Sequence, residues 1–192
     1  MLSFLPLLFI TFAAAGPIEE LPPICEGDLT VSYERPPTWV DDVSCDGTFA
    51  VMTLEFDNDS DCDTHITALS YEVEVRDDVA ADAFIESAFL TSRRGWTGDD
   101  VSVSGDAIII FADDPLFIVP AEGEARVTLM LTPDLDVCRH VDDEASVIVT
   151  FLLDDLTAER VGRPVEDIVP SGGVLYGDWV VVRSRPFRLL DE

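Results

Sequence analysis

Lysine is absent from this chain, and positive charge of any kind is scarce. The 11 basic residues are all arginines, against 39 aspartates and glutamates, so the formal net charge is −28 over 192 residues. A field of this sign repels nucleic acid and anionic lipid, and the composition therefore excludes both as partners. The acidity itself is typical of a solvated surface in a salty environment or of a coding bias that replaces Lys by Arg. Cation binding is the more specific alternative.

Histidine is also scarce, since the chain has only His65 and His140. General bases are therefore few. The glycine-rich segment Ser171–Gly173 lacks the Gly-x-Ser-x-Gly context of a hydrolase nucleophile. Paired acids are so numerous that they indicate loops and strand ends rather than the two carboxylates of a glycosidase. The sequence predicts no catalytic residue and a non-enzymatic protein, and a hydrolase with a site of scattered acids is the alternative.

Only one apolar run is long, and it lies at the N-terminus. Residues 2–12 are uncharged, and Ala13-Ala14-Ala15 follows as a small-residue cleavage site. This layout is typical of a secretory signal peptide, although no basic residue precedes the run, and the run is too short to span a bilayer. We expect a signal peptide over residues 1–15, a tether over 16–24 and one domain over 25–192. The mature chain is expected to be periplasmic, at the cell surface or extracellular, with no stable membrane insertion.

The apolar residues of the expected domain recur with a period of two, which is the signature of β-strands. The longest alternating segments are residues 48–56, 66–76, 125–132 and 146–153. Shorter strands are expected at residues 29–33, 101–103, 107–111 and 179–182. Many short strands with little helix predict an all-β protein, a single antiparallel β-sandwich of seven to nine strands.

Two segments fit the alternation less well. Residues 78–94 are expected to form a partly helical insertion, with a strand over Ala83–Leu90 as the alternative. Residues 156–173 are expected to form a long charged loop. Polar turns are expected at Asp57–Asp61 and Pro120–Glu124.

Two strand-and-turn patterns resemble those of bacterial immunoglobulin-like modules of exported proteins. Residues 56–61 (Phe-Asp-Asn-Asp-Ser-Asp) end a strand with an Asn-x-Ser turn, and residues 118–124 (Ile-Val-Pro-Ala-Glu-Gly-Glu) precede an alternating strand. The resemblance covers residues 27–189. It implies an immunoglobulin-like β-sandwich that serves in adhesion, as a spacer or in ligand presentation, and therefore a protein or glycan partner.

An even number of cysteines in an exported chain indicates disulfides, and Cys25, Cys45, Cys62 and Cys138 allow three pairings. If the fold is the implied sandwich, successive strands alternate in direction. Cys45 and Cys138 then lie at one end and Cys25 and Cys62 at the other, too far apart for bonds between the ends. We therefore expect Cys25–Cys62 and Cys45–Cys138. A lipid anchor at Cys25 is not expected, because Ile24 stands where a lipidation motif has a small residue.

Alternate carboxylates at Asp57, Asp59, Asp61 and Asp63 resemble the start of a calcium-binding loop. The pattern lacks the glycine at its sixth position and the glutamate at its twelfth, where Cys62 and Ala68 stand. A polar turn is the simpler interpretation, and a calcium-binding module is the alternative. Two thiols and two imidazoles could also form a zinc or copper site, with the ligands Cys62, His65, Cys138 and His140. Oxidation of the cysteines to disulfides would prevent this site.

Aromatic and basic residues give two weaker indications. Trp39, Trp96 and Trp179 indicate packing, or else a ligand surface. Arg183, Arg185 and Arg188 either pair with the acidic surface or receive an acidic partner. The sequence as a whole predicts a non-enzymatic exported binding, adhesion or envelope-structural module without a cofactor.

Overall fold

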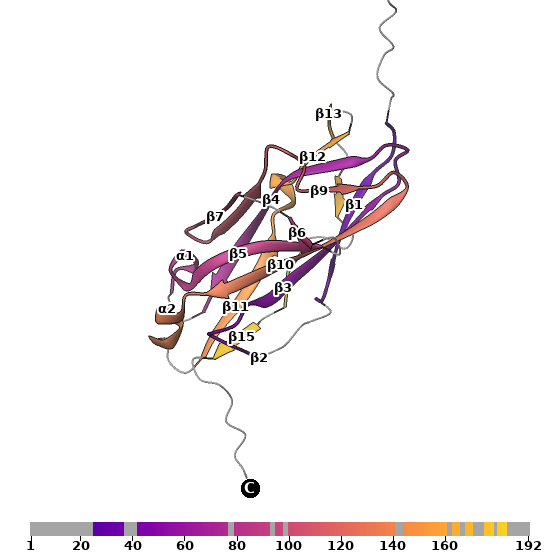
Figure 1. The fold of residues 1–192 in the computed structure, drawn as a ribbon. Helices are drawn as coiled ribbons and strands as arrows, with labels where there is room; N and C mark the ends of the chain where they lie inside the picture. The colour runs from indigo at the N-terminus through magenta and orange to yellow at the C-terminus, as the bar shows by residue number, and fades with distance from the viewer. Residues whose placement is uncertain are drawn as a thin grey trace, which may run out of the picture.

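A computed structural model describes residues 25–36, 42–76, 79–92, 95–97, 100–140, 144–160, 163–165, 168–170, 175–178 and 180–183. Within these residues two β-sheets enclose one apolar core (Figure 1). The all-β sandwich predicted from the period of two is confirmed. The expected signal peptide and tether, Trp39, Trp179, Arg185 and Arg188 lie outside the described residues, as do the side chains of Trp96 and Arg183.

The first sheet has the strand order β14-β1-β3-β10-β5-β6. Its centre is an antiparallel pair, β3 and β10, in which Leu54 lies opposite Val127. At one edge β14 runs parallel to β1. The strands are β1 (Leu29–Glu34), β3 (Phe49–Asn58), β5 (Ile85–Ser92), β6 (Gly95–Thr97), β10 (Gly123–Pro133) and β14 (Ile168–Pro170).

The second sheet is built around β4 (Thr64–Val75) and has the main order β13-β12-β4-β11-β15-β2. The strands β8 and β9 also pair with β4, and β7 pairs with β8. The pairs within the body of the two sheets are antiparallel as expected, and the parallel pairs β15–β2 and β14–β1 at the edges make the sheets mixed. The other strands are β2 (Asp42–Ser44), β7 (Asp100–Ser104), β8 (Ala107–Phe111), β9 (Phe117–Val119), β11 (Glu144–Phe151), β12 (Thr157–Arg160), β13 (Arg163–Pro164) and β15 (Val180–Arg183).

The core is filled by the alternating residues of both sheets. Leu54 and Phe56 of β3 are fully buried, and so are Leu129 of β10 and Ile108 of β8. Full burial of such a side chain stabilises the fold by about 1.5–3 kcal/mol. The period of two in the sequence thus corresponds directly to the two apolar faces that meet. No helix in the described part of the chain has both the length and the apolar character needed to cross a membrane.

The expected helical insertion over residues 78–94 is mostly strand. Helix α1 (Ala81–Phe84) has four residues, and β5 follows it immediately as a full member of the first sheet, paired with β10. The alternation in β5 is carried by Ala88 and Leu90, which are buried between exposed or half-buried neighbours. Two buried apolar residues of different size give only a weak alternation, so the sequence did not distinguish a strand from a helix here.

The expected long loop over residues 156–173 is wrong, because this segment contains β12, β13 and β14. In β12 the inward positions are Ala158 and Arg160, so a charged residue occupies a core position and hides the alternation. The sequence also did not predict β2, β9, the helix α2 (Leu135–His140) or the 3-10 turn at Leu153–Asp155.

Candidate functional site

Two disulfides close the sandwich at its two ends. Cys25 is bonded to Cys62 with a Cα–Cα distance of 5.6 Å, and Cys45 is bonded to Cys138 with a distance of 5.9 Å. This is the pairing expected from the alternation of strand direction. Because no cysteine is free, none can supply a thiolate to the zinc or copper set that the sequence suggested.

The four aspartates of the calcium-like pattern are spread along one loop. Asp57 is the penultimate residue of β3, and Asp59, Asp61 and Asp63 follow the end of the strand, all exposed. Asp63 accepts a hydrogen bond from the backbone N–H of Ala121 at 2.8 Å. Among the described residues, the one group of three potential metal ligands within 4.8 Å of one another is Cys25, Asp61 and Cys62, two of which are disulfide sulfurs. The four carboxylates are therefore not brought together.

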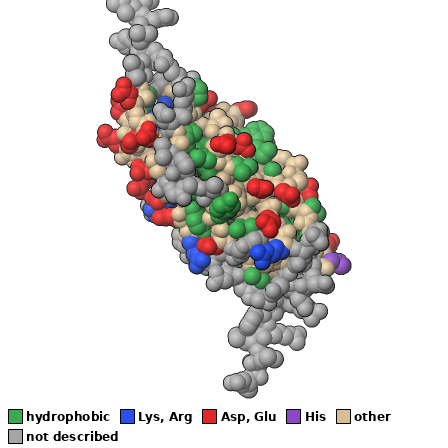
Figure 2. Space-filling model, turned by 180° about the vertical axis from the view of Figure 1, so that it is seen from behind, with side chains coloured by type: hydrophobic (Ala, Val, Ile, Leu, Met, Phe, Trp, Pro, Cys, Tyr) green, Lys and Arg blue, Asp and Glu red, His purple; other side chains and the backbone are tan. Residues whose placement is uncertain are grey.

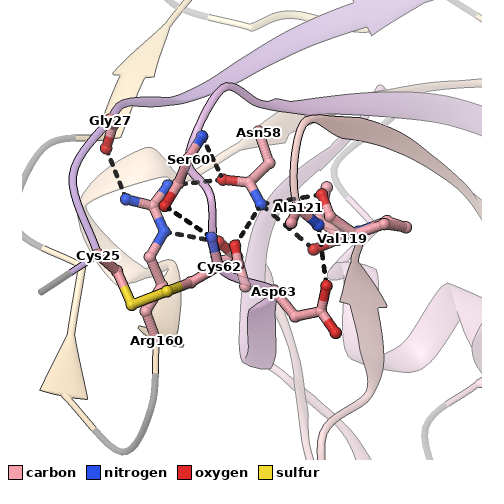
Figure 3. The surroundings of a disulfide bond; sticks show 11 residues. Cys25, Gly27, Asn58, Ser60, Cys62, Asp63, Val119, Ala121 and Arg160 are labelled. Carbon is pink, nitrogen blue, oxygen red and sulfur yellow. Dashed lines mark hydrogen bonds between the residues drawn. A yellow bond between two sulfur atoms is a disulfide. The ribbon is translucent and has the colours of Figure 1, made fainter. Parts of the chain in front are cut away.

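A buried arginine lies beneath the Cys25–Cys62 disulfide (Figure 3). Only 7% of Arg160 is exposed. Its Nε donates to Thr64 Oγ1 at 2.8 Å, one terminal nitrogen donates to Asn58 Oδ1 at 2.8 Å, and the other donates to the carbonyl of Gly27. Within the described residues no carboxylate forms an ion pair with Arg160, and the three acceptors of its guanidinium are neutral oxygens. Arg160 was not predictable from the sequence, because a charged residue gives no apolar signal.

The same network holds the acidic loop against the turn before β10. Asn58 is fully buried, and its side-chain amide donates to the carbonyls of Cys62 and Pro120, each at 2.9 Å. Gly27 has a φ of 116°, and an added Cβ would lie 2.9 Å from the backbone of Ser60. Only glycine fits this approach and this backbone conformation. Buried hydrogen bonds thus hold the loop in place.

A second polar contact ties the two sheets together. Tyr33 of β1 donates its hydroxyl to Asp178 Oδ2 at 2.9 Å, and Arg35 Nε donates to the same oxygen at 2.8 Å. Burial, together with the hydrogen bond to Asp178, raises the pKa of Tyr33 to about 12. The hydrogen bond from Arg35 holds the pKa of Asp178 below its usual value. The segment that carries Asp178 also bridges to β11 through Tyr176, so the contact is structural.

An apolar groove of about 590 Å³ opens between β9 and β10, where the two sheets diverge. Its wall on the second sheet is formed by Pro115, Leu116, Phe117 and Ile118. Its wall on the first sheet is formed by residues 124–127, and Ser92 and Pro120 complete the lining. Leu116 and Val127 are buried, whereas 43% of Ile118 is exposed.

The groove also contains two charged side chains. Glu124 is exposed, and Arg126 donates to Glu55 Oε1 and lies 3.6 Å from a carboxylate oxygen of Glu34. The hydrogen bond to Glu55 raises the pKa of Arg126. Arg126 is therefore already paired with acids of its own sheet, and Glu124, which also attracts Arg126 electrostatically, carries the other charge of the described lining.

A second depression, of about 520 Å³, lies on the outer face of the second sheet. Glu72, Glu74 and Asp106 line it together with Tyr176, and all four side chains are exposed. Such an open acidic surface has the character of a solvated face rather than of an enclosed catalytic carboxylate pair. Figure 2, which views the molecule from behind, shows hydrophobic side chains lying among acidic ones on that face. Exposed apolar residues of the described chain include Ile109 and Phe111 of β8.

Comparison with known proteins gives a weak likeness in fold. No family model matches the sequence, and no curated protein matches it. A chain of a type I cohesin–dockerin complex from Clostridium thermocellum has 12% identity and a TM-score of 0.38, covering 85% of this chain and 99% of that one. The full-length major pilin RrgB from Streptococcus pneumoniae has 12% identity and a TM-score of 0.32, covering 66% of this chain and 23% of the pilin.

A third solved structure is the collagen-binding subdomain of the Enterococcus faecalis surface protein ACE. It has 9% identity and a TM-score of 0.23, and the match covers 78% of this chain and 99% of the subdomain. All three scores lie below 0.5, so we assign no property of these proteins to this chain.

Proposed function

We propose that this chain is an exported, non-enzymatic module that binds a protein partner through the groove between β9 and β10. The observation that carries the proposal is the groove itself, a concave apolar surface with a large exposed residue, Ile118, at its wall. Concave apolar surfaces with few polar groups are the usual sites of ligand and partner binding. Adhesive and envelope-structural roles both consist of binding of this kind.

The surroundings of the groove support binding rather than catalysis. The described lining contains no histidine and no cysteine, and its one arginine is engaged by Glu55. Export is supported by the two disulfides, because disulfides persist in oxidising compartments. Both disulfides also restrain the loops at the two ends, so the groove lies on a rigid framework.

The proposal is tested by selecting ligands for the chain from a phage-displayed random library of peptides of about twelve residues and, in parallel, from a glycan array. Each ligand is then measured against two variants, Ile118→Ser and Ile109→Ser. The two residues have 43% and 42% exposure, but only Ile118 lines the groove. We expect peptide ligands whose affinity falls at least tenfold in the first variant and stays unchanged in the second. The proposal would be contradicted if the affinity of the ligands were unchanged in Ile118→Ser, or if only glycans bound.

A further inference from the structure

Within the described part of the chain, the edge of β10 beside the groove has no strand partner over four residues, Gly123–Arg126. β10 pairs with β3 from Gly123 to Leu131, but with β5 only from Val127 to Pro133. β5 ends at Ser92, which also pairs with Gly95 of β6. Among the described residues, Gly123–Arg126 therefore have a strand neighbour on one side only. Such an edge offers backbone N–H and C=O groups to another strand.

The opposite wall of the groove has a free edge as well. In the described chain β9 pairs with β4 alone, through Thr64–Ile66. Phe117 of β9 packs edge-on against Phe56, with ring centroids 5.1 Å apart, so this wall is anchored to the core. The space between the two free edges is the apolar groove described above, and it has walls that can receive alternate side chains of an extended peptide.

The end of the groove is strongly acidic. Glu124 lies directly opposite Asp57 in the register of β10 and β3, and both side chains are exposed. Like charges at directly opposite positions of two strands are destabilising. The turn before β10 adds Glu122, and the buried network holds the loop with Asp59 and Asp61 against that turn, since the N–H of Glu122 donates to the carbonyl of Ser60. A cation placed here would relieve the repulsion.

We propose that the occupant of the groove is an extended basic peptide of a partner protein, which adds as a strand to the free edge of β10 at Glu124–Arg126. Its alternate apolar side chains enter the groove beside Ile118, and a Lys or Arg at one end lies against Glu124 and Asp57. This inference rests on the proposed function and specifies the partner. A second copy of the chain is a poor occupant, because two molecules of net charge −28 repel each other.

The probes are two displayed peptide libraries with Val, Ile or Leu at alternate positions and Ser or Thr between them. One library ends in two lysines and the other in two glutamates. We expect the intact chain to enrich peptides from the basic library only. Synthetic copies of these peptides with methylated backbone nitrogens should bind at least tenfold more weakly, because they cannot donate to a strand edge. Amide hydrogen exchange at residues 124–126 should slow when the unmodified peptide is bound.

Two charge reversals supply matched variants. Glu124→Lys should weaken the basic peptides at least tenfold. Glu86→Lys reverses an exposed charge on β5 outside the groove and should leave their affinity within about twofold after correction for net charge. Thermal unfolding of both variants shows whether they remain folded. Because Glu124→Lys also removes the repulsion with Asp57, we expect this variant to stay folded. A loss of binding would then reflect the lost charge of Glu124.

The outcomes separate this inference from the proposed function. Strand addition is overturned, and the groove remains the binding site, if ligands that depend on Ile118 show any of three results. They bind equally well when their backbone is methylated, they are acidic, or their affinity is unchanged in Glu124→Lys. Ligands that do not depend on Ile118 overturn both. Dimerisation of the chain that is lost in Ile118→Ser would also overturn the inference, because it makes a second copy the occupant.

Discussion

At the scale of single residues, the buried Arg160 is the clearest departure from an apolar core. Its three acceptors are Thr64 Oγ1, Asn58 Oδ1 and the carbonyl of Gly27, and each loses a donor if the guanidinium is removed. Unsatisfied buried acceptors cost about 1–3 kcal/mol each where no water replaces the donor. We expect Arg160→Met to lower the free energy of unfolding by about 2–4 kcal/mol.

The measurement for Arg160 is urea denaturation, and Arg139→Met is the control. Arg139 lies exposed on α2, so removal of the same charge there should change the free energy of unfolding by less than about 0.5 kcal/mol. If both variants behaved alike, the hydrogen bonds of Arg160 would contribute nothing to stability.

Tyr71 is the opposite case, a fully buried hydroxyl that has no hydrogen-bond partner among the residues that the structure describes. Tyr71→Phe keeps the ring contact with Phe151, whose centroid is 5.5 Å away, and removes only the unsatisfied group. We expect the variant to equal the wild type at neutral pH or to gain about 1 kcal/mol. Tyr33→Phe is the matched control, because it loses a bond to Asp178 and should cost about 1 kcal/mol.

The pH dependence of the Tyr71 variant follows from the same burial. Burial raises the pKa of Tyr71 above its ordinary value of 10.0, so the folded protein keeps this proton where the unfolded chain loses it. The wild type therefore loses stability as the pH rises above 10, by up to about 1.4 kcal/mol per pH unit from this one group. Tyr71→Phe should show a shallower alkaline decline in denaturation series between pH 9 and about pH 11. An equal slope would mean that Tyr71 is solvated in the folded state.

At the scale of elements, the strands that alternate strongly were predictable and the weak ones were not. β3, β4, β10 and β11 carry large apolar residues on one face, so propensity and burial agree. β12 places Arg160 inward, and its partners Asn58 and Gly27 come from distant parts of the chain. A core position filled by a charged residue can be recognised only once those partners are known.

The groove was unpredictable for a related reason. Its walls, β9 and β10, belong to different sheets, and within the described residues one edge of β10 is free because β5 ends at Ser92. Turn position and sheet pairing are long-range properties that a local pattern does not contain. The acidic loop was visible in the sequence, but its place beside the groove was not.

The disulfides connect elements that are far apart in the chain, and their loops differ in length. The sequence separation is 93 residues for Cys45–Cys138 and 37 residues for Cys25–Cys62. In the chain-entropy model these loops contribute about 4.6 and about 3.8 kcal/mol to the free energy of unfolding. We expect the double variant Cys45→Ser/Cys138→Ser to lose more stability than Cys25→Ser/Cys62→Ser.

Guanidinium denaturation of the two double variants measures this difference. The Cys25–Cys62 bond also lies over the Arg160 network, which is buried at that end of the sandwich. A larger loss from Cys25→Ser/Cys62→Ser would therefore show that packing around the disulfide outweighs loop entropy.

At the scale of the whole molecule, the period of two determines the core and the charge balance determines the character of the surface. Alternation supplies a core that two sheets share, and most acids of the described residues are exposed around it. The composition predicts that the surface repels nucleic acid and anionic lipid, and in our proposal the groove determines which partner binds. A net charge of −28 also sets the conditions under which the fold is stable.

Self-repulsion of this charge favours expanded states, so salt should stabilise the protein. The Debye length falls from about 20 Å to about 4 Å between about 0.02 M and about 0.5 M NaCl. We expect the Tm to rise by on the order of 5 °C over this range in thermal unfolding experiments. A Tm that does not respond to NaCl would show that the acids are neutralised within the folded protein.

Because the four aspartates 57, 59, 61 and 63 do not converge, calcium and magnesium added at equal concentration in high salt should have equal effects on the Tm. A further rise with calcium alone would instead indicate a specific site that binds the folded state, since ligand binding stabilises it by mass action.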